Sequence, residues 1–452
     1  MATKQLKQAE GPLVQFINRT VIPLLLILLV PQSVMYLWYA SVHCQGSLTE
    51  LADRLTNRGG PALVWAAVSV ANPAVYAAIL AFCAFQVLLM LLVPGRTCYG
   101  TETPTGHVPE YKDNGFACYL ITMATFLAGT VYLKQRGLTP TVIYDYYGDF
   151  LASMILLSLA FCLLLCVKGV LAPTSTDHGR SGNYLFDYYW GTELYPRICG
   201  IDIKVFTNCR FGLTVWALAV AVFALKSYEL HGRVVDGMAV TAALQLLYLT
   251  KFFWWEAGYY RTIDIITDRA GFYICWGCLC FVPSFYTLVS LFMVRQPEPV
   301  GPAWTAALLG FGLASLAVNY WSDWQKQAAR AADGQLNIWG RPARVIRAKY
   351  SLDNGQERQS VLLASGFWAV SRHFHYIPEL SLTLCWSAVC GTGCHIIPYM
   401  YFAFLSVLLF HRSFRDDKKC RDKYGSTGPS TANWCRTRLC RSCSDSLQFT
   451  AS

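Results

Sequence analysis

The stretch FLASMILLSLAFCLLLCVKGVL at residues 150–171 decides the fold class. A helix that crosses a bilayer needs about 20 predominantly apolar residues, because the hydrocarbon core is about 30 Å thick. This stretch meets that length and contains no acidic residue. It therefore predicts a transmembrane helix.

Seven further apolar blocks of similar character follow the same pattern. They lie at 21–42, 74–93, 117–133, 211–225, 238–255, 271–294 and 304–321. A last apolar block, 380–410, is divided by Gly-Thr-Gly at 391–393, which predicts a pair of shorter, tightly turned helices. We therefore predict an all-α polytopic membrane protein with about 9–10 transmembrane helices.

The composition also indicates a membrane protein. Of the 452 residues, 54% are hydrophobic and 14% are charged, whereas about 25% of the residues in soluble proteins are charged. Most of the 18 cysteines lie in apolar blocks, so we expect reduced thiols and no metal site. The sequence matches neither the Rossmann nor the P-loop nucleotide motif, and we expect no nucleic-acid partner.

Basic residues before the first span predict the orientation of the chain. Lys4, Lys7 and Arg19 place this end in the cytosol by the positive-inside rule. We expect residues 1–20 to be a short cytosolic segment without a cleaved signal peptide, and residues 21–425 to form the membrane domain. The loops that would then face the cytosol are those near 95–116, 172–210, 256–270 and 322–377.

Two polar clusters between the spans contain charged groups. The first, GTELYPRICGIDIKVF at 191–206, contains Glu193, Arg197, Asp202 and Lys204. The second, KFFWWEAGYYRTIDIITD at 251–268, contains Glu256, Asp264 and Asp268. Carboxylates at membrane depth are costly and usually functional. A solvated loop explains the first cluster equally well, and an interfacial aromatic belt explains the second.

Two further clusters are cationic. Lys326 and Arg330 are four residues apart, so they share a helix face that suits a phosphate, although positive-inside residues alone would give the same pattern. Asp-Gly at 333–334 ends that helix, and KYSLDNGQERQSVLL, which ends at Leu363, predicts a β-hairpin with an Asn-Gly turn.

The last cluster joins two segments that are distant in sequence. SGFWAVSRHFHYIPEL at 365–380 contains Arg372, His373, His375 and Tyr376, and HRSFRDDKKCRDKYG occupies 411–425. If the helices of 380–410 form a hairpin, the two segments meet on the cytosolic side as a pocket for an anionic ligand. Composition alone leaves three classes open: an enzyme acting on a lipid, a transporter of an organic anion, and a receptor.

These segments, together with GTELYPRICGIDIKVF, YYRTIDIITD and IWGRPARVIR, resemble the sterol reductase family (ERG4/ERG24 type) of the endoplasmic reticulum. The resemblance runs from about residue 74 to 425. The motif RHFHY resembles that of the family branch whose members reduce the C7–C8 double bond of sterols such as 7-dehydrocholesterol. The Δ14-reductases and lamin B receptor usually read RHPNY at this place.

The resemblance implies a multi-pass enzyme of the endoplasmic reticulum membrane that reduces a ring double bond of a sterol with NADPH. Its cofactor half would span about 302–425, and its sterol would enter from the bilayer between the helices of 238–294. The implied cofactor-binding residues are Lys326, Arg330, Leu363, Trp368, His375, Tyr376, Asp416, Cys420, Arg421, Asp422, Lys423 and Tyr424. The candidates for the proton donor are Tyr376, His375, Glu256 and Asp268.

Alternatives to this activity are a sterol Δ14-reductase and a sterol-binding membrane protein on the same fold with impaired turnover. Partners would be the sterol, membrane lipids and, as a further expectation, other enzymes of sterol biosynthesis. Bound NADPH with turnover would distinguish the enzyme from the binding protein.

The tail at 426–452 departs from what the resemblance implies. Family members continue with a segment like YWKLYCEKVPYR, and reading the codons of residues 426–438 in a shifted frame allows HWPKYCELVPYK. We therefore predict that this tail is a frameshifted reading of the usual C-terminus, which would weaken NADPH binding or stability. Resequencing the genomic region tests this, and codons that cannot spell that segment would contradict it.

Overall fold

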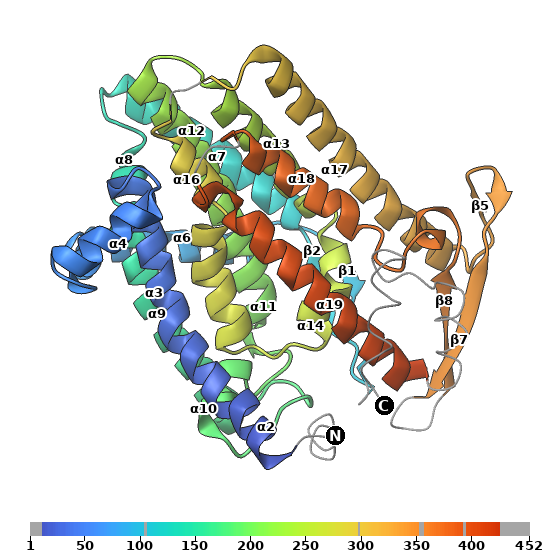
Figure 1. Ribbon diagram of the computed structural model, residues 1–452. Coiled ribbons are helices and arrows are strands. Elements are labelled where there is room, and N and C mark those ends of the chain that lie inside the picture. The colour runs from blue at the N-terminus through green and yellow to red at the C-terminus, as the bar shows by residue number, and fades with distance from the viewer. Residues whose placement is uncertain (1–10, 104–105, 297–298, 352–356, 392–394, 425–452) are drawn as a thin grey trace. The chain divides into compact units, whose positions relative to one another are not determined.

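The computed structural model describes residues 11–103, 106–296, 299–351, 357–391 and 395–424. It is mostly helical, with four two-stranded antiparallel sheets among the described residues (Figure 1). Each of the eight predicted apolar blocks forms a helix or a run of consecutive helices, which confirms the all-α membrane class. The chain divides near Val300 into two compact units, which are described separately below.

Seven helical stretches in the described part of the chain are long and apolar enough to cross a membrane. They are Pro12–His43, Pro73–Leu92, Gly115–Gln135, Tyr147–Leu171, Ile203–His231, Phe272–Met293 and Pro302–Ala331. The remaining predicted blocks form α13 (Asp236–Trp254), α18 (Tyr376–Ala388) and α19 (Met400–Tyr424).

The first unit contains the helices that precede residue 300. They are α2 (Pro12–Phe16), η1 (Ile17–Val21), α3 (Ile22–His43), α4 (Leu48–Asn57), α5 (Ala62–Ala66), α6 (Pro73–Leu92), α7 (Gly115–Gln135), α8 (Val142–Asp145), α9 (Tyr147–Leu171), α10 (Tyr184–Trp190), α11 (Ile203–Val205), η2 (Phe206–Leu213), α12 (Thr214–His231), α13, η3 (Glu256–Arg261), α14 (Ile263–Ile266), η4 (Phe272–Phe281), α15 (Val282–Phe285) and α16 (Leu288–Met293). Its strands are β1 (Arg96–Tyr99), β2 (Glu110–Asp113), β3 (Arg197–Ile198) and β4 (Ile201–Asp202).

The core of this unit combines large rings with paired polar groups. Trp216 of α12 is buried, and its indole Nε1 donates to Gln245 Oε1 of α13 over 2.7 Å. The Gln245 amide in turn donates to Thr241 and Ser290, each over 2.9 Å. Such pairing is needed because an unpaired polar group in hydrocarbon costs several kcal/mol.

Three loops that were expected on one side of the membrane meet at one end of this unit. Tyr111 of β2 stacks on Tyr260 of η3, with ring centroids 4.2 Å apart. Arg197 of β3 donates to the backbone carbonyl of Glu110. The contacts confirm that the three loops lie at the same end, while the assignment of that end to the cytosol stays a prediction.

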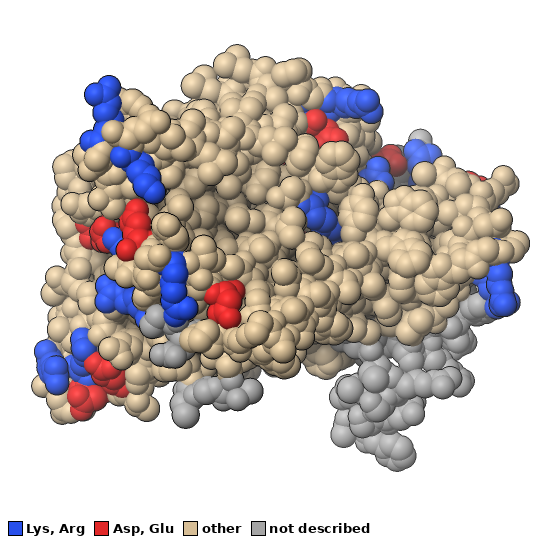
Figure 2. All heavy atoms as spheres, turned by 90° about the horizontal axis from the view of Figure 1, so that it is seen from above, with Lys and Arg blue, Asp and Glu red and all other residues tan. Residues whose placement is uncertain are grey.

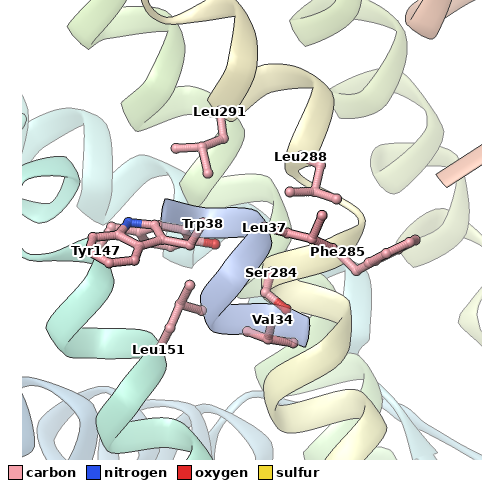
Figure 3. Close-up of a pocket in the computed structure, with 9 residues that line it drawn as sticks. All are labelled: Val34, Leu37, Trp38, Tyr147, Leu151, Ser284, Phe285, Leu288 and Leu291. Carbon is pink, nitrogen blue, oxygen red and sulfur yellow. The ribbon is translucent and has the colours of Figure 1, made fainter. Parts of the chain in front are cut away.

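A small apolar cavity lies among α3, α9 and the α15–α16 segment of this unit. Its empty volume is about 210 Å³, and side chains such as Leu37, Leu151 and Leu288 line it (Figure 3). This figure includes open solvent, and the space between the side chains leaves no room for a water molecule. The gap is therefore not a candidate ligand site.

The second unit contains α17 (Pro302–Ala331), η5 (Gly366–Ala369), α18 and α19, and η6 (Ile397–Tyr399) leads into α19. Its strands are β5 (Asn337–Ile338), β6 (Arg341–Pro342), β7 (Val345–Ser351) and β8 (Glu357–Leu363). The antiparallel pair β7–β8 confirms the predicted hairpin, whose Asn-Gly turn lies outside the described residues. As predicted, α17 ends before Asp333 and Gly334, both of which have positive φ.

The surface agrees with a protein that sits in lipid. Figure 2 shows a face on which charged side chains form small, separated groups on an otherwise uncharged surface. Exposed leucines of α3, α6 and α9 contribute to the apolar surface, among them Leu28, Leu92 and Leu164.

Candidate functional site

One face of α17 holds the loop that contains RHFHY. Asn319 donates from its amide nitrogen to the backbone carbonyl of His375 and to the Glu379 carboxylate, each over 3.0 Å. Gln325 accepts from the backbone N–H of Phe367 over 3.1 Å. Both polar side chains are buried, so they fix the loop against the helix rather than contact water.

Trp368 connects the loop to the predicted cations. Its indole Nε1 donates to the backbone carbonyl of Ser322 over 2.7 Å, and its ring is buried. Lys326 places its Nζ 4.4 Å from the centroid of this ring, in a cation–π contact. The Lys326 ammonium also lies 3.8 Å from Asp323. The amine is thus held at the edge of an aromatic surface and remains partly exposed.

A series of ring contacts continues from Trp368 toward α18. His375 lies 5.3 Å from Trp368 and 4.4 Å from Tyr376, measured between ring centroids. Tyr376 stacks on His373 at 5.0 Å with an interplanar angle of 12°. Two imidazoles, a phenol and an indole therefore form one continuous aromatic surface beside the Lys326 ammonium.

Two carboxylates of α19 lie on the far side of this cluster. Two guanidinium nitrogens of Arg372 pair with the two carboxylate oxygens of Asp417, over 2.8 and 3.4 Å. His373 Nε2 lies 3.9 Å from Asp416. The expected meeting of the RHFHY segment with 411–425 is therefore observed within the second unit.

The pKa of the His373 imidazole is shifted by its surroundings. Burial lowers the pKa of His373 from its ordinary value of 6.5, although the carboxylates of Asp416 and Asp417 act in the opposite direction. The neighbouring cations Arg372 and Lys326 lower this pKa further. The environment of His373 therefore favours the neutral imidazole, in which one ring nitrogen is an acceptor.

This shift predicts a loss of stability in acid. Because the folded-state pKa lies below the unfolded one, the unfolded chain binds more protons as pH falls through 6.5, and the free energy of unfolding decreases. In detergent, titration from about pH 8 to about pH 5 is expected to destabilise the parent protein more than a His373→Gln variant. Equal pH profiles for the two proteins would contradict this assignment.

The other predicted cofactor residues lie on α17, β8 and α19 of the second unit. Arg330 is exposed one helical turn beyond Lys326, and Leu363 ends β8. Cys420 lies one turn beyond Asp416 on α19. Arg421, Asp422, Lys423 and Tyr424 belong to the last turn of α19, and their side chains lie outside the described residues.

Sequence reasoning missed three residues that hold the site together: Asn319, Ser322 and Gln325. Two of them precede Lys326 by four and seven residues, a spacing that puts Asn319, Ser322 and Lys326 on one helix face. The signal in the sequence was a set of small or amide side chains that recur at this spacing within an apolar span, which indicates a polar face on the helix.

The rival proton donors, Glu256 and Asp268, belong to the first unit. Arg210 donates through two guanidinium nitrogens to both carboxylate oxygens of Glu256, and Tyr260 donates its hydroxyl to the same carboxylate over 2.8 Å. Gly115 allows the close approach of this carboxylate, because a Cβ there would overlap it. Glu256 is therefore engaged in a buried ion pair.

Asp268 lies beside a second buried cation. The Lys204 ammonium donates to the backbone carbonyls of Asp264, Ile265 and Asp268 over 3.2, 2.6 and 2.9 Å. The Asp268 carboxylate accepts from the hydroxyl of Thr267 over 3.1 Å. The buried ammonium of Lys204 thus joins the polar clusters at 191–206 and 251–268.

The donor set of the second unit is suited to a dinucleotide. Cations at Lys326 and Arg330 match phosphate groups, and the planar surface of Trp368, His375 and Tyr376 matches an aromatic or nicotinamide ring. Among the described residues, no three or more His, Cys, Asp or Glu side chains lie together in a way that could hold a metal ion.

Comparison with known proteins gives consistent matches. The chain is 43% identical to a 7-dehydrocholesterol reductase of Arabidopsis thaliana over 401 residues, which cover 87% of this chain and 90% of that protein. It is 33% identical to a 7-dehydrocholesterol reductase of Xenopus laevis over 378 residues, or 81% and 78% of the two chains. A Delta(14)-sterol reductase of Methylotuvimicrobium alcaliphilum is 32% identical over 405 residues, or 89% and 90%.

A family model also matches most of the sequence. The model described as the ergosterol biosynthesis ERG4/ERG24 family covers residues 17–439. This range is wider than the range of about 74 to 425 over which the motifs resemble the family. The protein therefore belongs to the ERG4/ERG24 family of sterol reductases.

Proposed function

We propose that this protein reduces the C7–C8 double bond of a sterol with NADPH in the endoplasmic reticulum membrane. The observation that carries the cofactor assignment is the continuous contact series from Lys326 through Trp368 and His375 to Tyr376. The choice of double bond rests on similarity to relatives named 7-dehydrocholesterol reductase and on the wording RHFHY.

Different residues of the second unit bind the phosphate groups and the ring of the cofactor. Lys326 and Arg330 bind phosphate groups, and Trp368 supplies a ring surface whose position its bond to Ser322 fixes. NADPH, when bound, supplies the hydride. The protein has to supply a proton to the neighbouring carbon, and a hydroxyl or imidazole at Tyr376 or His375 would be placed on the same surface.

An assay with microsomes from cells that express the chain, supplied with 7-dehydrocholesterol and NADPH, tests this function. We expect a product two mass units heavier that has lost the C7–C8 double bond, and no product when NADH replaces NADPH. Sterol binding without any product would favour the non-enzymatic alternative. Membranes without the expressed chain are the control for endogenous reductases.

A Δ14-reductase is the second candidate, because a relative with that name shares 32% identity over most of both chains. The two activities can be distinguished by supplying a sterol with a C14–C15 double bond together with 7-dehydrocholesterol and measuring which sterol is reduced. Preferential loss of the C14–C15 double bond would overturn the C7–C8 assignment and leave the family unchanged.

Substitutions at the four candidate donors are expected to separate positioning from proton transfer. Loss of a general acid lowers kcat by about 10²–10⁴-fold and changes its pH dependence, whereas loss of a binding contact raises KM. We expect Tyr376→Phe or His375→Ala to show the kcat effect. Glu256→Gln and Asp268→Asn test the rivals, and four variants with the kcat of the parent would place the acid elsewhere.

A further inference from the structure

The second unit exposes tryptophans at the end of α17. Trp321 is 46% exposed, Trp324 is 50% exposed, and Trp339 at the tip of the β5–β6 hairpin is 54% exposed. At about 100° per residue, Trp321 and Trp324 lie about 150° around α17 from Asn319 and Lys326, and about 60° from each other. These two rings therefore project away from the helix face that carries the candidate cofactor site.

The length of α17 places these rings at a membrane boundary. Residues 302–322 of this helix contain no charged side chain, and the first charge is Asp323. Trp304, which is 52% exposed, and Trp324 are separated by about 30 Å along the helix, the thickness of a hydrocarbon core. Tryptophans prefer both interfaces of a bilayer, so Trp321 and Trp324 mark one of them.

The β5–β6 hairpin adds a third ring at the same level. Trp339 and Gly340 form its two-residue turn, both with positive φ, and a bulky residue in that conformation is uncommon. The Trp339 ring packs edge-on against Phe367 at 4.9 Å and lies 6.4 Å from Trp321. Figure 1 shows this hairpin, labelled β5, beside the C-terminal end of α17.

Basic side chains follow the exposed ring directly. Arg341, Arg344, Arg347 and Lys349 lie within the segment 339–350, which contains no acidic residue, and all four are exposed. Arg347 is compensated by Asp333 at 2.8 Å. Arg341 and Arg344 lie closest in sequence to the hairpin tip, where phosphate groups of lipids would be found.

We propose that Trp321, Trp324 and the β5–β6 hairpin form a tryptophan anchor that sits in the headgroup layer and selects anionic phospholipids through Arg341 and Arg344. The occupant is a bilayer rather than a protein, because the exposed rings continue an uncharged helix of membrane-spanning length. Each arginine near an anionic surface favours binding by about fivefold. The inference does not depend on which sterol the protein reduces.

Photo-crosslinking from the hairpin tip tests the anchor. The full chain with p-benzoylphenylalanine in place of Trp339 is reconstituted in nanodiscs of mixed zwitterionic and anionic phospholipids, and crosslinked species are identified by mass. A matched control carries the same group in place of Gln359, an exposed residue of β8 that pairs with Lys349 across the β7–β8 hairpin. We expect phospholipid adducts at position 339, enriched in anionic species, and none at 359.

A second set of variants tests whether the charges of Arg341 and Arg344 are needed for the selection of anionic phospholipids. Arg341→Gln with Arg344→Gln is expected to reduce the anionic enrichment about fivefold per arginine removed, whereas Arg341→Lys with Arg344→Lys retains it. The lysine pair also controls for folding, since it changes the same two positions. Adducts to protein, equal lipid adducts at 339 and 359, or enrichment unchanged in the glutamine pair would each overturn the proposal.

Discussion

Replacing Lys326 and Arg330 together by alanine is expected to raise the KM for NADPH about a hundredfold or more, with little change in the KM for the sterol. A hydrogen bond to a charged group contributes about 1.5–3 kcal/mol, which corresponds to about tenfold or more for each residue. Lys326 has a second role, because its ammonium also contacts the Trp368 ring. Its replacement should therefore have the larger effect of the two.

Steady-state kinetics with each substrate varied in turn measures this effect. The matched control is Lys349→Ala with Arg358→Ala, which removes one lysine and one arginine that are exposed on the β7–β8 hairpin. The control should leave the KM for NADPH within about twofold, since exposed charges at a distance are screened by salt. The same NADPH dependence in all three proteins would place the cofactor away from α17.

Sequence patterns were sufficient to predict the helices and the meeting of the RHFHY segment with α19. Hydrophobic length predicted α9 and the other spans because membrane insertion depends mainly on composition over about 20 residues. The Asp-Gly stop after α17 and the β7–β8 hairpin follow from local turn chemistry. The meeting of RHFHY with α19 required only that two helices joined by a short segment turn back on each other.

Pairings between distant residues could not be predicted in this way. Arg210 and Glu256 are 46 positions apart, and which carboxylate meets which cation depends on how α12, α13 and the π-helical segment η2 pack. Neighbouring positions on a helix differ by about 100°, so Asp416 and Asp417 reach different partners, His373 and Arg372. That choice depends on the rotation of α19, which sequence periodicity leaves open.

The largest effect on stability is expected at the buried pair of Arg210 and Glu256. Their side chains are 1% and 0% exposed, and Asn114 and Tyr260 supply further hydrogen bonds to the pair. Glu256→Gln leaves a buried guanidinium without its counter-charge, so we expect the free energy of unfolding to fall by about 3–5 kcal/mol. Denaturant unfolding of the purified protein in detergent measures this loss.

A surface pair provides the matched control. Glu50 and Arg54 form a salt bridge on α4 with side chains that are 41% and 24% exposed, and Glu50→Gln should leave the free energy of unfolding almost unchanged. Combining Arg210→Met with Glu256→Gln removes both charges and should recover part of the loss. If Glu256 were instead the proton donor, Glu256→Gln would lower kcat in protein that is still fully folded. A stable but inactive variant would therefore contradict a structural role for this carboxylate.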